Sequence, residues 1–459
     1  MMNLALAARM TGAELRGDGT VAFTAVSTDT RNLSEGALFV ALRGERFNGH
    51  DYLDAARERG AAAALVDHAG SAGAPLPLLV VDDTRAGLGR LAGQWRRQFS
   101  IPLIAVVGSN GKTTVKEMTA AILRAHCADG QSRETVLVTE GNLNNDVGLP
   151  LTLLRLRAKH ACAVVEIGMN HPGETGELAP LAAPTIGVIN NAQREHQEFM
   201  RSVEAVAREH AALLDSVSAG GVAVINADDA HAGIWREAAQ RRGLRIRDFG
   251  LVRPAAVGAT YSDHPEGASI RLSSPQGCAD IELHAFGEHS VRNALAAAAA
   301  ATAAGAGIEA VARGLGLFRP VKGRLERKRG KGGATLLDDT YNANPDSVRA
   351  AIDVLALACG IRILVLGDMG EVGSKGREFH AEIGAYARER GIERLFAVGE
   401  LAHEAAMAFG KDAVHFDAAE KLAPAIIEGL GGPATILVKG SRFMHMERVV
   451  SALEASACC

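Results

Sequence analysis

The stretch that most constrains the fold of this chain lies between residues 103 and 123. Five apolar residues, Leu103–Val107, predict a buried strand, and a glycine turn over 108–111 leads into a helix that opens with Lys112. Phosphate binding needs this order, because the glycines let backbone N–H groups converge, the helix N-terminus adds partial positive charge, and the lysine reaches the phosphate oxygens. The segment predicts a nucleotide-binding loop. Its candidate contacts are Gly108, Ser109, Asn110, Gly111, Lys112, Thr113 and Thr114.

The spacing of this loop departs from the usual G-x-x-x-x-G-K-[ST] pattern. Val106 occupies the position of the first glycine, and Gly108 instead begins a shorter G-x-x-G-K-T-T. A structural turn with an exposed lysine is the alternative, but strand, turn, GKTT and helix occur together in order, which favours phosphate binding. The hydroxyl of Thr113 is then placed to coordinate Mg²⁺ beside the phosphates.

A carboxylate on a second strand would complete a magnesium site. The apolar run 161–165 ends in Glu166, and one carboxylate, one threonine hydroxyl and phosphate oxygens suffice for an ion that keeps several waters. A glutamate that caps the next turn is the alternative.

His196 follows another apolar strand, at the same expected sheet edge, although a lone histidine more often makes a structural hydrogen bond. The sequence has no HExxH motif and no His/Cys cluster, so a zinc site is not expected.

Short β-branched runs alternate with Ala- and Leu-rich helical patterns through the rest of the chain, which is typical of parallel α/β layers. Three α/β domains are expected. The first, residues 1–85, is small; the central one, 86–317, has a mostly parallel sheet; the C-terminal one, 318–459, is Rossmann-like. Besides 103–107, strands are expected at 163–167, 186–190, 222–226, 361–366 and 436–438.

A second glycine pattern, Gly367-Asp-Met-Gly370-Glu-Val-Gly373, follows the predicted strand 361–366. Its spacing is G-x-x-G-x-x-G rather than G-x-G-x-x-G, and no acidic residue occupies the expected ribose position. We interpret it as a turn that does not bind a dinucleotide. The charged run Arg324–Lys331 is interpreted partly as a solvated hairpin.

Composition excludes several classes of protein. Forty-nine Lys and Arg against 53 Asp and Glu leave a formal net charge of −4, so no basic excess is available to hold a nucleic-acid backbone. The six cysteines form no CxxC pair and predict reduced thiols, with Cys458 and Cys459 as an incidental tail. No signal-peptide pattern opens the chain, and the alanine-rich run 294–304 is too short and too weakly apolar to span a bilayer. A cytoplasmic location without membrane insertion is expected.

Ten stretches of the chain, spread over essentially its whole length, resemble the Mur ligases of peptidoglycan synthesis. GKTT marks the wider family, whereas TYNANP and LGDMGE match the branch whose acceptor is D-alanyl-D-alanine. The stretches are VSTDTR (26–31), ALRGERFNGHDYL (41–53), GSNGKTTVKEM (108–118), GNLNNDVGLPLTLL (141–154), VVEIGMNHPGE (164–174), NNAQREH (190–196), KGRLE (322–326), DDTYNANPDSV (338–348), LGDMGEVG (366–373) and KGSRFMHME (439–447).

The resemblance implies a monomeric ligase that uses ATP and Mg²⁺. In this family an N-terminal domain binds the UDP-sugar, a central domain binds ATP, and a C-terminal domain closes over both. The terminal carboxylate of the UDP-MurNAc-tripeptide would be activated as an acyl phosphate by the γ-phosphate of ATP. The amine of D-alanyl-D-alanine would then attack, giving an amide, ADP and phosphate.

The resemblance also implies roles for individual residues. The catalytic set would be Lys112, Glu166, His196 and Arg324, of which Glu166 and His196 join Thr113 around the metal. Asn344 would lie beside the nucleotide. Further ATP contacts would come from Asn293, Arg324, Asp339, Tyr341 and Asn342. Contacts to the UDP-sugar peptide would come from Thr28, Asp29, Arg31, Arg46 with the loop to His50, Asn144 and Asn145.

The chain departs from the family pattern at two positions. Many members read His-Asn-x-x-Asn where this chain has His289-Ser290-Val-Arg-Asn293, so a hydroxyl replaces one amide. Several members carry a carbamate-modified lysine where His210 stands here. A neutral imidazole is not an anionic metal bridge, so the sequence leaves a second magnesium site open.

Two other functions fit parts of the pattern. A related acyl-phosphate ligase with another amine acceptor, such as an earlier Mur ligase or a folylpolyglutamate synthase, would share GKTT but not TYNANP and LGDMGE. A nucleotide-gated binding protein that hydrolyses ATP slowly would share the phosphate loop, but VSTDTR and FNGHD in a separate N-terminal domain disfavour it.

Overall fold

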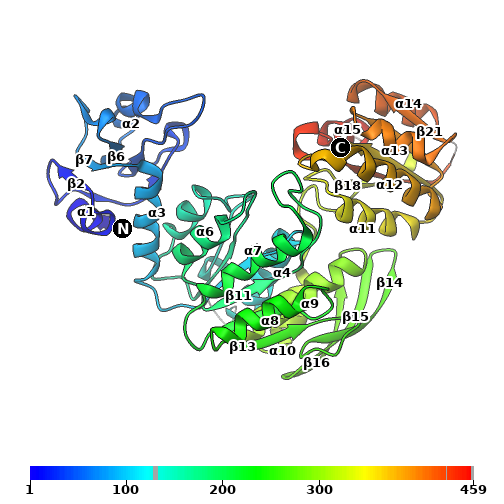
Figure 1. The fold of residues 1–459 in the computed structure, drawn as a ribbon, viewed down its shortest axis with the longest axis horizontal. Helices are drawn as coiled ribbons and strands as arrows, with labels where there is room; N and C mark the ends of the chain where they lie inside the picture. Colours follow the sequence, from blue (N-terminus) through cyan, green and yellow to red (C-terminus); the bar gives the residue numbers. More distant parts are fainter. Residues whose placement is uncertain (128–132, 431, 456–459) are drawn as a thin grey trace.

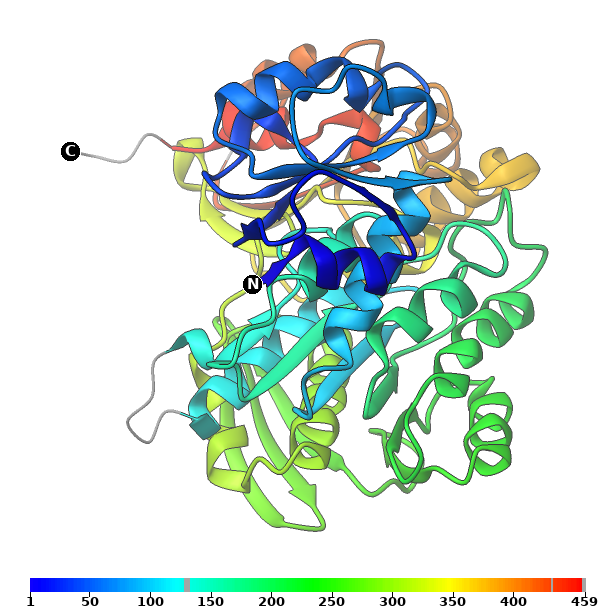
Figure 2. The same cartoon turned by 90° about the vertical axis from the view of Figure 1, so that its left-hand side faces the viewer.

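The computed structural model describes residues 1–127, 133–430 and 432–455, so Cys458 and Cys459 lie outside the described residues. The described residues form three α/β domains, and the N-terminal and C-terminal domains lie above opposite ends of the central one in Figure 1. Figure 2 gives the view from the side of the N-terminal domain. None of the helices in the described part of the chain combines the length and the apolarity that a bilayer crossing requires.

The N-terminal domain is built on a five-stranded sheet in the order β2-β7-β6-β5-β4, in which β2 is antiparallel to its neighbour and the other pairs are parallel. Alternate residues of each strand face opposite cores, so that Leu38 and Leu65 pack on one side and Phe39 and Ala64 on the other. A ribbon of β1 and β3 stands beside this sheet. The elements are β1 (Met2–Asn3), α1 (Leu4–Thr11), β2 (Glu14–Arg16), β3 (Ala22–Phe23), β4 (Val26–Ser27), β5 (Leu38–Val40), α2 (Leu53–Glu58), β6 (Ala63–Asp67) and β7 (Leu78–Val81).

Helix α3 (Thr84–Arg96) connects the first two domains. Asp83 caps its N-terminus by accepting a hydrogen bond from the backbone N–H of Ala86. The helix packs against α1 of the N-terminal domain and against α5 (Gly148–Leu153) and α6 (Glu174–Ala182) of the central domain. Its buried residues Leu88 and Leu91 belong to one apolar core that continues from the N-terminal domain into the central one.

The central domain contains a six-stranded parallel sheet in the order β13-β12-β11-β8-β10-β9. Strand β8 lies between β11 and β10, so the chain changes direction across the sheet there. Open α/β sheets bind ligands at the carboxyl ends of the strands beside such a point. The elements are β8 (Leu103–Val107), α4 (Lys112–Cys127), β9 (Val136–Val138), α5 (Gly148–Leu153), β10 (Cys162–Glu166), α6 (Glu174–Ala182), β11 (Ile186–Ile189), α7 (Val203–Asp215), β12 (Val222–Asn226), α8 (Ala232–Arg241) and β13 (Arg245–Phe249).

A second layer covers one face of this sheet. It consists of the antiparallel strands β14 (Gly258–His264), β15 (Gly267–Ser274) and β16 (Gly277–Leu283), and the helices α9 (Glu288–Ala303) and α10 (Ile308–Leu317). The alanine run of α9 is buried against α4 and the sheet, because alanine side chains let the helix approach its neighbours closely. The other face of the sheet belongs to the core shared with α3.

The C-terminal domain contains a six-stranded sheet in the order β17-β18-β22-β19-β20-β21, parallel except for β17. The charged run 324–331 was expected to be partly a hairpin, and it contains β17, which pairs antiparallel with β18 further along the chain. The elements are β17 (Glu326–Arg329), β18 (Thr335–Asp339), α11 (Pro345–Ala356), β19 (Ile361–Gly367), α12 (Gly376–Glu389), β20 (Arg394–Val398), α13 (Ala402–Phe409), β21 (Ala413–Phe416), α14 (Leu422–Glu428), β22 (Ala434–Lys439) and α15 (Glu447–Leu453).

The six strands expected from the sequence are confirmed. β8 and β12 have the predicted bounds, β11 and β19 differ by one residue at the C-terminal end, and β10 begins and ends one residue earlier than predicted. β22 begins two residues earlier and ends one residue later than predicted, because Ala434, Thr435 and Lys439 also pair with β18 or β19.

Candidate active site

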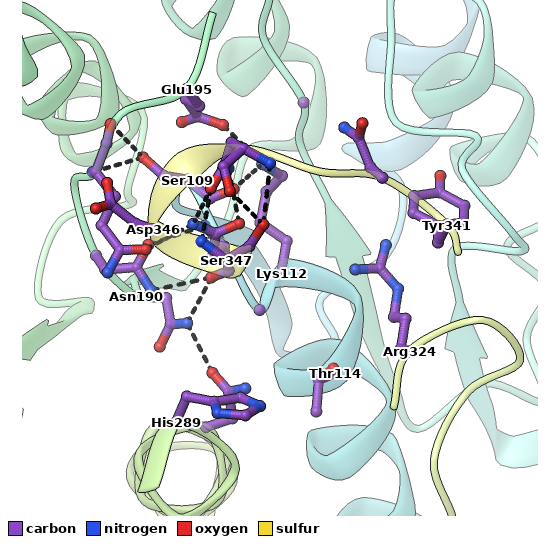
Figure 3. A pocket seen from close by; sticks show the side chains of 18 of the residues that line it. Ser109, Lys112, Thr114, Asn190, Glu195, His289, Arg324, Tyr341, Asp346 and Ser347 are labelled. Carbon is purple, nitrogen blue, oxygen red and sulfur yellow. Dashed lines mark hydrogen bonds and ion pairs between the residues drawn. The ribbon is translucent and has the colours of Figure 1, made fainter. Parts of the chain in front are cut away.

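A cavity of about 990 Å³ lies between the central and C-terminal domains. The phosphate loop, the loop after β11 and the N-terminus of α9 line it from the central domain. Arg324 and the segment 339–347 line it from the C-terminal side. Figure 3 shows Lys112 and Glu195 on one side of this space and Arg324 beside Tyr341 on the other.

The phosphate loop has the backbone that its glycines were expected to allow. Gly108 has a φ of +143° and Gly111 a φ of +81°, both in the region that favours glycine. A Cβ atom on Gly111 would lie 2.4 Å from Oδ1 of Asn293, which leaves no space for a side chain. Lys112 Nζ donates to the carbonyl oxygen of Gly108 at 2.5 Å and is thereby folded over the loop.

Thr113 and Glu166 meet at the carboxyl edge of the sheet because β8 and β10 are parallel neighbours. The Thr113 hydroxyl donates to Glu166 Oε2 at 2.8 Å, and Arg324 Nη2 donates to the same hydroxyl at 2.8 Å. The second oxygen of Glu166 accepts a 2.8 Å bond from the side-chain amide of Asn144. Thr113 and Glu166 are buried, so this cluster offers oxygen donors away from bulk water.

Glu195 is a cavity residue that the sequence reasoning did not single out. Its side chain is 5% exposed; Oε1 bonds His210 Nε2 at 3.1 Å, and Oε2 lies 3.5 Å from Lys112 Nζ. Burial alone would raise the pKa of Glu195, but Lys112 and His210 outweigh it and lower the pKa to about 2. His210 therefore pairs with a buried carboxylate in this chain.

His196 lies in the loop after β11 and lines the same cavity. Its Nδ1 is 2.5 Å from Oε2 of Glu371, which belongs to the C-terminal domain, and its Nε2 is 3.7 Å from Oε2 of Glu195. The contact with His196 lowers the pKa of Glu371, although Nδ1 of His196 makes no hydrogen bond within the described residues. Glu371 was also not singled out from the sequence, because the pair forms only when two domains meet.

Two further contacts join the domains beside the phosphate loop. Arg194 donates to Asp346 through Nη2 at 2.7 Å and to Glu382 through Nη1 at 2.7 Å. Burial opposes the charge of Arg194, but these two carboxylates raise its pKa above its ordinary value. The side-chain amides of Asn110 and Asn344 exchange hydrogen bonds of 3.2 and 2.9 Å.

The expected nucleotide-contact residues gather on the other side of the loop. Asn293 Oδ1 accepts a 2.9 Å bond from the amide of Asn190, and the guanidinium carbon of Arg324 lies 4.1 Å from the Tyr341 ring centroid. Asp339 is already paired, since Lys439 Nζ lies 2.6 Å from its Oδ2. Asn293, Arg324, Asp339, Tyr341 and Asn342 all line the cavity, as do His289 and Ser290.

The residues expected to contact the UDP-sugar divide into two groups. Asn144 and Asn145 line the cavity, and Asn145 Oδ1 also accepts a 2.8 Å bond from the N–H of Gly148, the first residue of α5. No described residue of the N-terminal domain lines it. Asp29 and Arg31 form an ion pair of 2.8 Å with each other, and the Arg31 side chain is 85% exposed. The remaining two, Thr28 and Arg46, also lie in the N-terminal domain, outside this cavity.

The fold and this site define a three-domain nucleotide-binding protein whose phosphate loop is contacted by its C-terminal domain. Three family models match: Mur ligase family, catalytic domain, over residues 22–96; Mur ligase middle domain, over 106–301; and Mur ligase, glutamate ligase domain, over 323–442. The chain belongs to the Mur ligase family.

Individual relatives align over nearly the full length. The UDP-N-acetylmuramoyl-tripeptide–D-alanyl-D-alanine ligase of Escherichia coli K12 is 39% identical over 450 residues, 97% of each chain. A crystal structure of MurF from Acinetobacter baumannii superimposes with a TM-score of 0.91 at 33% identity, over 98% of each chain. The MurF ligase of Thermotoga maritima in complex with ADP superimposes with a TM-score of 0.81 at 25% identity, over 93% of this chain and 96% of that one.

Proposed function

We propose that this protein is the ATP-dependent ligase that joins D-alanyl-D-alanine to UDP-MurNAc-tripeptide. The observation that carries the proposal is the contact of Thr113 with both Glu166 and Arg324, which joins the phosphate loop, a buried carboxylate and the C-terminal domain at one point. The 39% identity with the Escherichia coli ligase of that name, over 97% of each chain, supports the same substrates. The ADP complex of the Thermotoga maritima relative supports ATP as the nucleotide.

The reaction requires two anions to be brought together. A carboxylate oxygen of the tripeptide attacks the γ-phosphorus, the bond from that phosphorus to the β–γ bridging oxygen breaks, and ADP leaves. The dipeptide amine then attacks the acyl carbon, phosphate leaves with the electron pair of the C–O bond, and the amine loses a proton. We assign Lys112 and Arg324 to offset the negative charge, since Lys112 folds over the phosphate loop and Arg324 reaches Thr113 from the C-terminal side of the cavity.

The residues around Thr113 fit a magnesium ion. The Thr113 hydroxyl and the Glu166 carboxylate are buried oxygen donors, which is the ligand type that Mg²⁺ prefers. In the described part of the chain no three His, Cys, Asp or Glu side chains form a closed cage, which suits an ion that also takes phosphate oxygens and waters. When bound, the ion would neutralise phosphate charge. We place His196 at the edge of this site and name Thr113, Glu166 and His196 as its residues.

The nucleotide would lie along the opposite wall. Asn293 presents an amide beside Gly111, and the Arg324 guanidinium lies over the Tyr341 ring. Asp339 and Asn342 occupy the same wall and would contact the ribose and the base side of ATP. Because Lys439 already pairs with Asp339, that carboxylate is held in place before ATP binds.

The N-terminal segment 1–85 is assigned to the UDP end of the sugar nucleotide, through Thr28, Asp29, Arg31 and Arg46. Arginine and backbone N–H groups are natural partners of a diphosphate. Asn144 and Asn145 lie at the cavity, where they would face the peptide end. We assign segment 86–317 to ATP binding and 318–459 to closure over both substrates, in a cytoplasmic monomer.

The test is an exchange of acceptors with the amide product identified by mass. With UDP-MurNAc-tripeptide and ATP fixed, D-alanyl-D-alanine is expected to give UDP-MurNAc-pentapeptide, whereas L-alanine, D-glutamate, diaminopimelate and L-glutamate are expected to give no product. Product with one of the other amines, and none with the dipeptide, would assign the chain to another acyl-phosphate ligase. ATP hydrolysis indifferent to every UDP-peptide would instead indicate a nucleotide-gated binding protein.

A further inference from the structure

The end of strand β12 makes contacts with the loops on both sides of it. The side-chain amide of Asn226 donates to the carbonyl oxygen of Asn190 at 2.9 Å, and so reaches the end of β11, where the chain contacts the phosphate loop. Asp228, two residues later, reaches instead the loop 250–253, which follows β13. Because β12 lies between β11 and β13, its end can hold both loops in place relative to each other.

The carboxylate of Asp228 is bound by consecutive backbone N–H groups of this loop. Leu251 donates to Oδ2 at 2.7 Å, Arg253 donates to Oδ1 at 2.7 Å, and Val252 donates to Oδ1 at 3.1 Å. A Cβ atom on Gly250 would lie 2.9 Å from Oδ1, so the close approach of the loop favours glycine there. Successive N–H groups arranged in this way bind anions, and here the anion belongs to the chain itself.

Arg292 of helix α9 is the charged partner of the same carboxylate. Its Nη1 forms an ion pair with Asp228 Oδ2, and its Nη2 lies 2.7 Å from Oε1 of Glu288, one turn earlier in the helix. The side chain of Asp228 is 6% exposed and that of Arg292 is 23% exposed. Burial alone would raise the pKa of Asp228, but the backbone N–H groups and Arg292 outweigh it and lower the pKa. The carboxylate is therefore held in its ionised form.

The ion pair fixes the helix turn that carries Asn293, the residue that directly follows Arg292. Oδ1 of Asn293 accepts a 2.9 Å bond from the amide of Asn190 and lies where a Cβ atom on Gly111 would be. A buried ion pair adds little net stability over an apolar contact, and the role best supported for such pairs is to fix how elements are placed. Here the two elements are the end of β12 and the first turns of α9.

The contacts of Asp228 are therefore directed at the wall of the nucleotide cavity. Asp228, Val252, Arg292 and Asn293 all line this cavity. Val252 is 77% exposed, and an apolar side chain that is open at a cavity wall gains contact when a ligand covers it. Both oxygens of Asp228 are already bound by the loop and by Arg292, so its carboxylate acts through these partners rather than by touching a ligand.

We propose that Asp228 is a positioning residue for the nucleotide: its carboxylate holds the first turns of α9 through Arg292 and the loop 250–253 through backbone N–H groups, so that Asn293 and Val252 face ATP. The inference rests on the proposed function, because it takes ATP as the ligand of this cavity. It assigns Asp228 to nucleotide binding and not to the transfer of the phosphoryl group.

Titration calorimetry with ADP and Mg²⁺, without the UDP-peptide, measures nucleotide binding alone. Asp228→Asn keeps the size of the side chain but removes the charge that pairs with Arg292, and the Kd for ADP is expected to rise about 5- to 30-fold. Arg292→Gln is expected to weaken binding to a similar degree, and Arg292→Lys to recover part of the loss. Asp280→Asn is the matched control, because it breaks an exposed ion pair with Arg271 in the same domain, and it is expected to leave the Kd unchanged.

A double variant shows whether the two residues act as one pair. Because either single change breaks the same ion pair, Asp228→Asn combined with Arg292→Gln is expected to bind ADP about as weakly as the weaker single variant. Phosphate release with all substrates supplies the second readout. Each single variant is expected to raise the KM for ATP, with a smaller change in kcat.

The outcomes separate this proposal from the proposed function. A purely structural role would lower the fraction of chains that bind ADP, seen as a reduced stoichiometry, and would leave the Kd at its native value. That result would overturn the proposal, and so would losses that simply add in the double variant. If the native chain and Asp228→Asn bind ADP equally well, the proposed function stands and the positioning role is refuted. A native chain that binds no ADP would refute both.

Discussion

Thr113 Oγ1 lies 2.8 Å from Glu166 Oε2, so the first turn after the phosphate loop and the end of the neighbouring strand meet in one buried hydrogen bond. The same hydroxyl accepts a bond from Arg324, a residue of the segment that leads into the C-terminal domain. Phosphate loop, acidic strand end and interdomain arginine are thereby combined within one hydrogen-bonded group. Substitutions at Thr113, Glu166 or Arg324 are expected to change the Mg²⁺ requirement and the reaction of the nucleotide more than they change the fold.

Replacement of Glu166 by Gln is expected to raise the Mg²⁺ concentration needed for half-maximal phosphate release by about 10-fold or more. The amide keeps the shape of the side chain but removes the negative charge that a hard cation prefers. Phosphate release is measured over a Mg²⁺ series, with Glu140→Gln, an exposed glutamate after β9, as the control. The same Mg²⁺ dependence in Glu166→Gln and the native protein would remove Glu166 from the metal site.

Lys112→Ala is expected to reduce ADP formation at least about 10³-fold while the protein stays folded. The ammonium group lies over the phosphate loop, bonded to Gly108, where it would meet the β- and γ-phosphates. ADP is measured by coupled assay and folding by circular dichroism. Lys159→Ala, which removes an exposed lysine paired with Glu134, should keep native activity. Near-normal turnover in Lys112→Ala would contradict the phosphate-loop assignment.

Arg194→Gln should loosen the contact between the central and C-terminal domains. The change removes the ion pairs from Arg194 to Asp346 and Glu382. The Arg194 side chain is 23% exposed. We expect a larger radius of gyration in small-angle scattering and a several-fold lower kcat/KM for ATP. Arg208→Gln, which breaks an exposed pair within α7, is the control. An unchanged radius together with unchanged kcat/KM would show that these ion pairs do not hold the domains.

The pKa of Glu195, at about 2, makes stability depend on pH in a defined direction. The unfolded chain binds a proton at this residue near pH ~4.3, while the folded protein does so only near 2. The ionised group therefore contributes stability fully above that unfolded pKa, and the contribution falls as pH drops through the folded pKa.

We test this by urea unfolding of the native protein and Glu195→Gln between pH 3 and 7. The difference in free energy of unfolding is expected to shrink as pH falls below about 4.3. Glu177→Gln, at an exposed position of α6, serves as the control. A difference that stays constant over this range would contradict the lowered pKa.

The sheet positions could be predicted from the sequence because they depend on local pattern. A run of five apolar residues predicts β8, and Glu166 was placed at the edge of the sheet because a strand of the same kind ends there. The glycines of the phosphate loop are needed because a Cβ atom at Gly108 or Gly111 would collide with Asn190 or Asn293. The apolar run of β8 and the acidic end of β10 are each set within a few residues of chain.

The rest of the site could not be predicted because it depends on how domains dock. Glu371 stood in a glycine pattern that resembled a dinucleotide turn, and its contact with His196 spans 175 positions of sequence. Glu195 was not singled out from the sequence, because its burial beside His210 and Lys112 depends on how distant segments fold together. Asp29 and Arg31 pair with each other in the absence of substrate, so their role in UDP binding stays a prediction.

The most direct test of the central claim is phosphate release from ATP and Mg²⁺ in the presence of UDP-MurNAc-tripeptide and D-alanyl-D-alanine, with each component omitted in turn. The ligase account predicts rapid release only when all components are present, and one amide formed for each phosphate released. Release that needs the UDP-peptide but ignores the dipeptide would keep the acyl-phosphate chemistry and contradict the acceptor. Release that ignores both would contradict the ligase function itself.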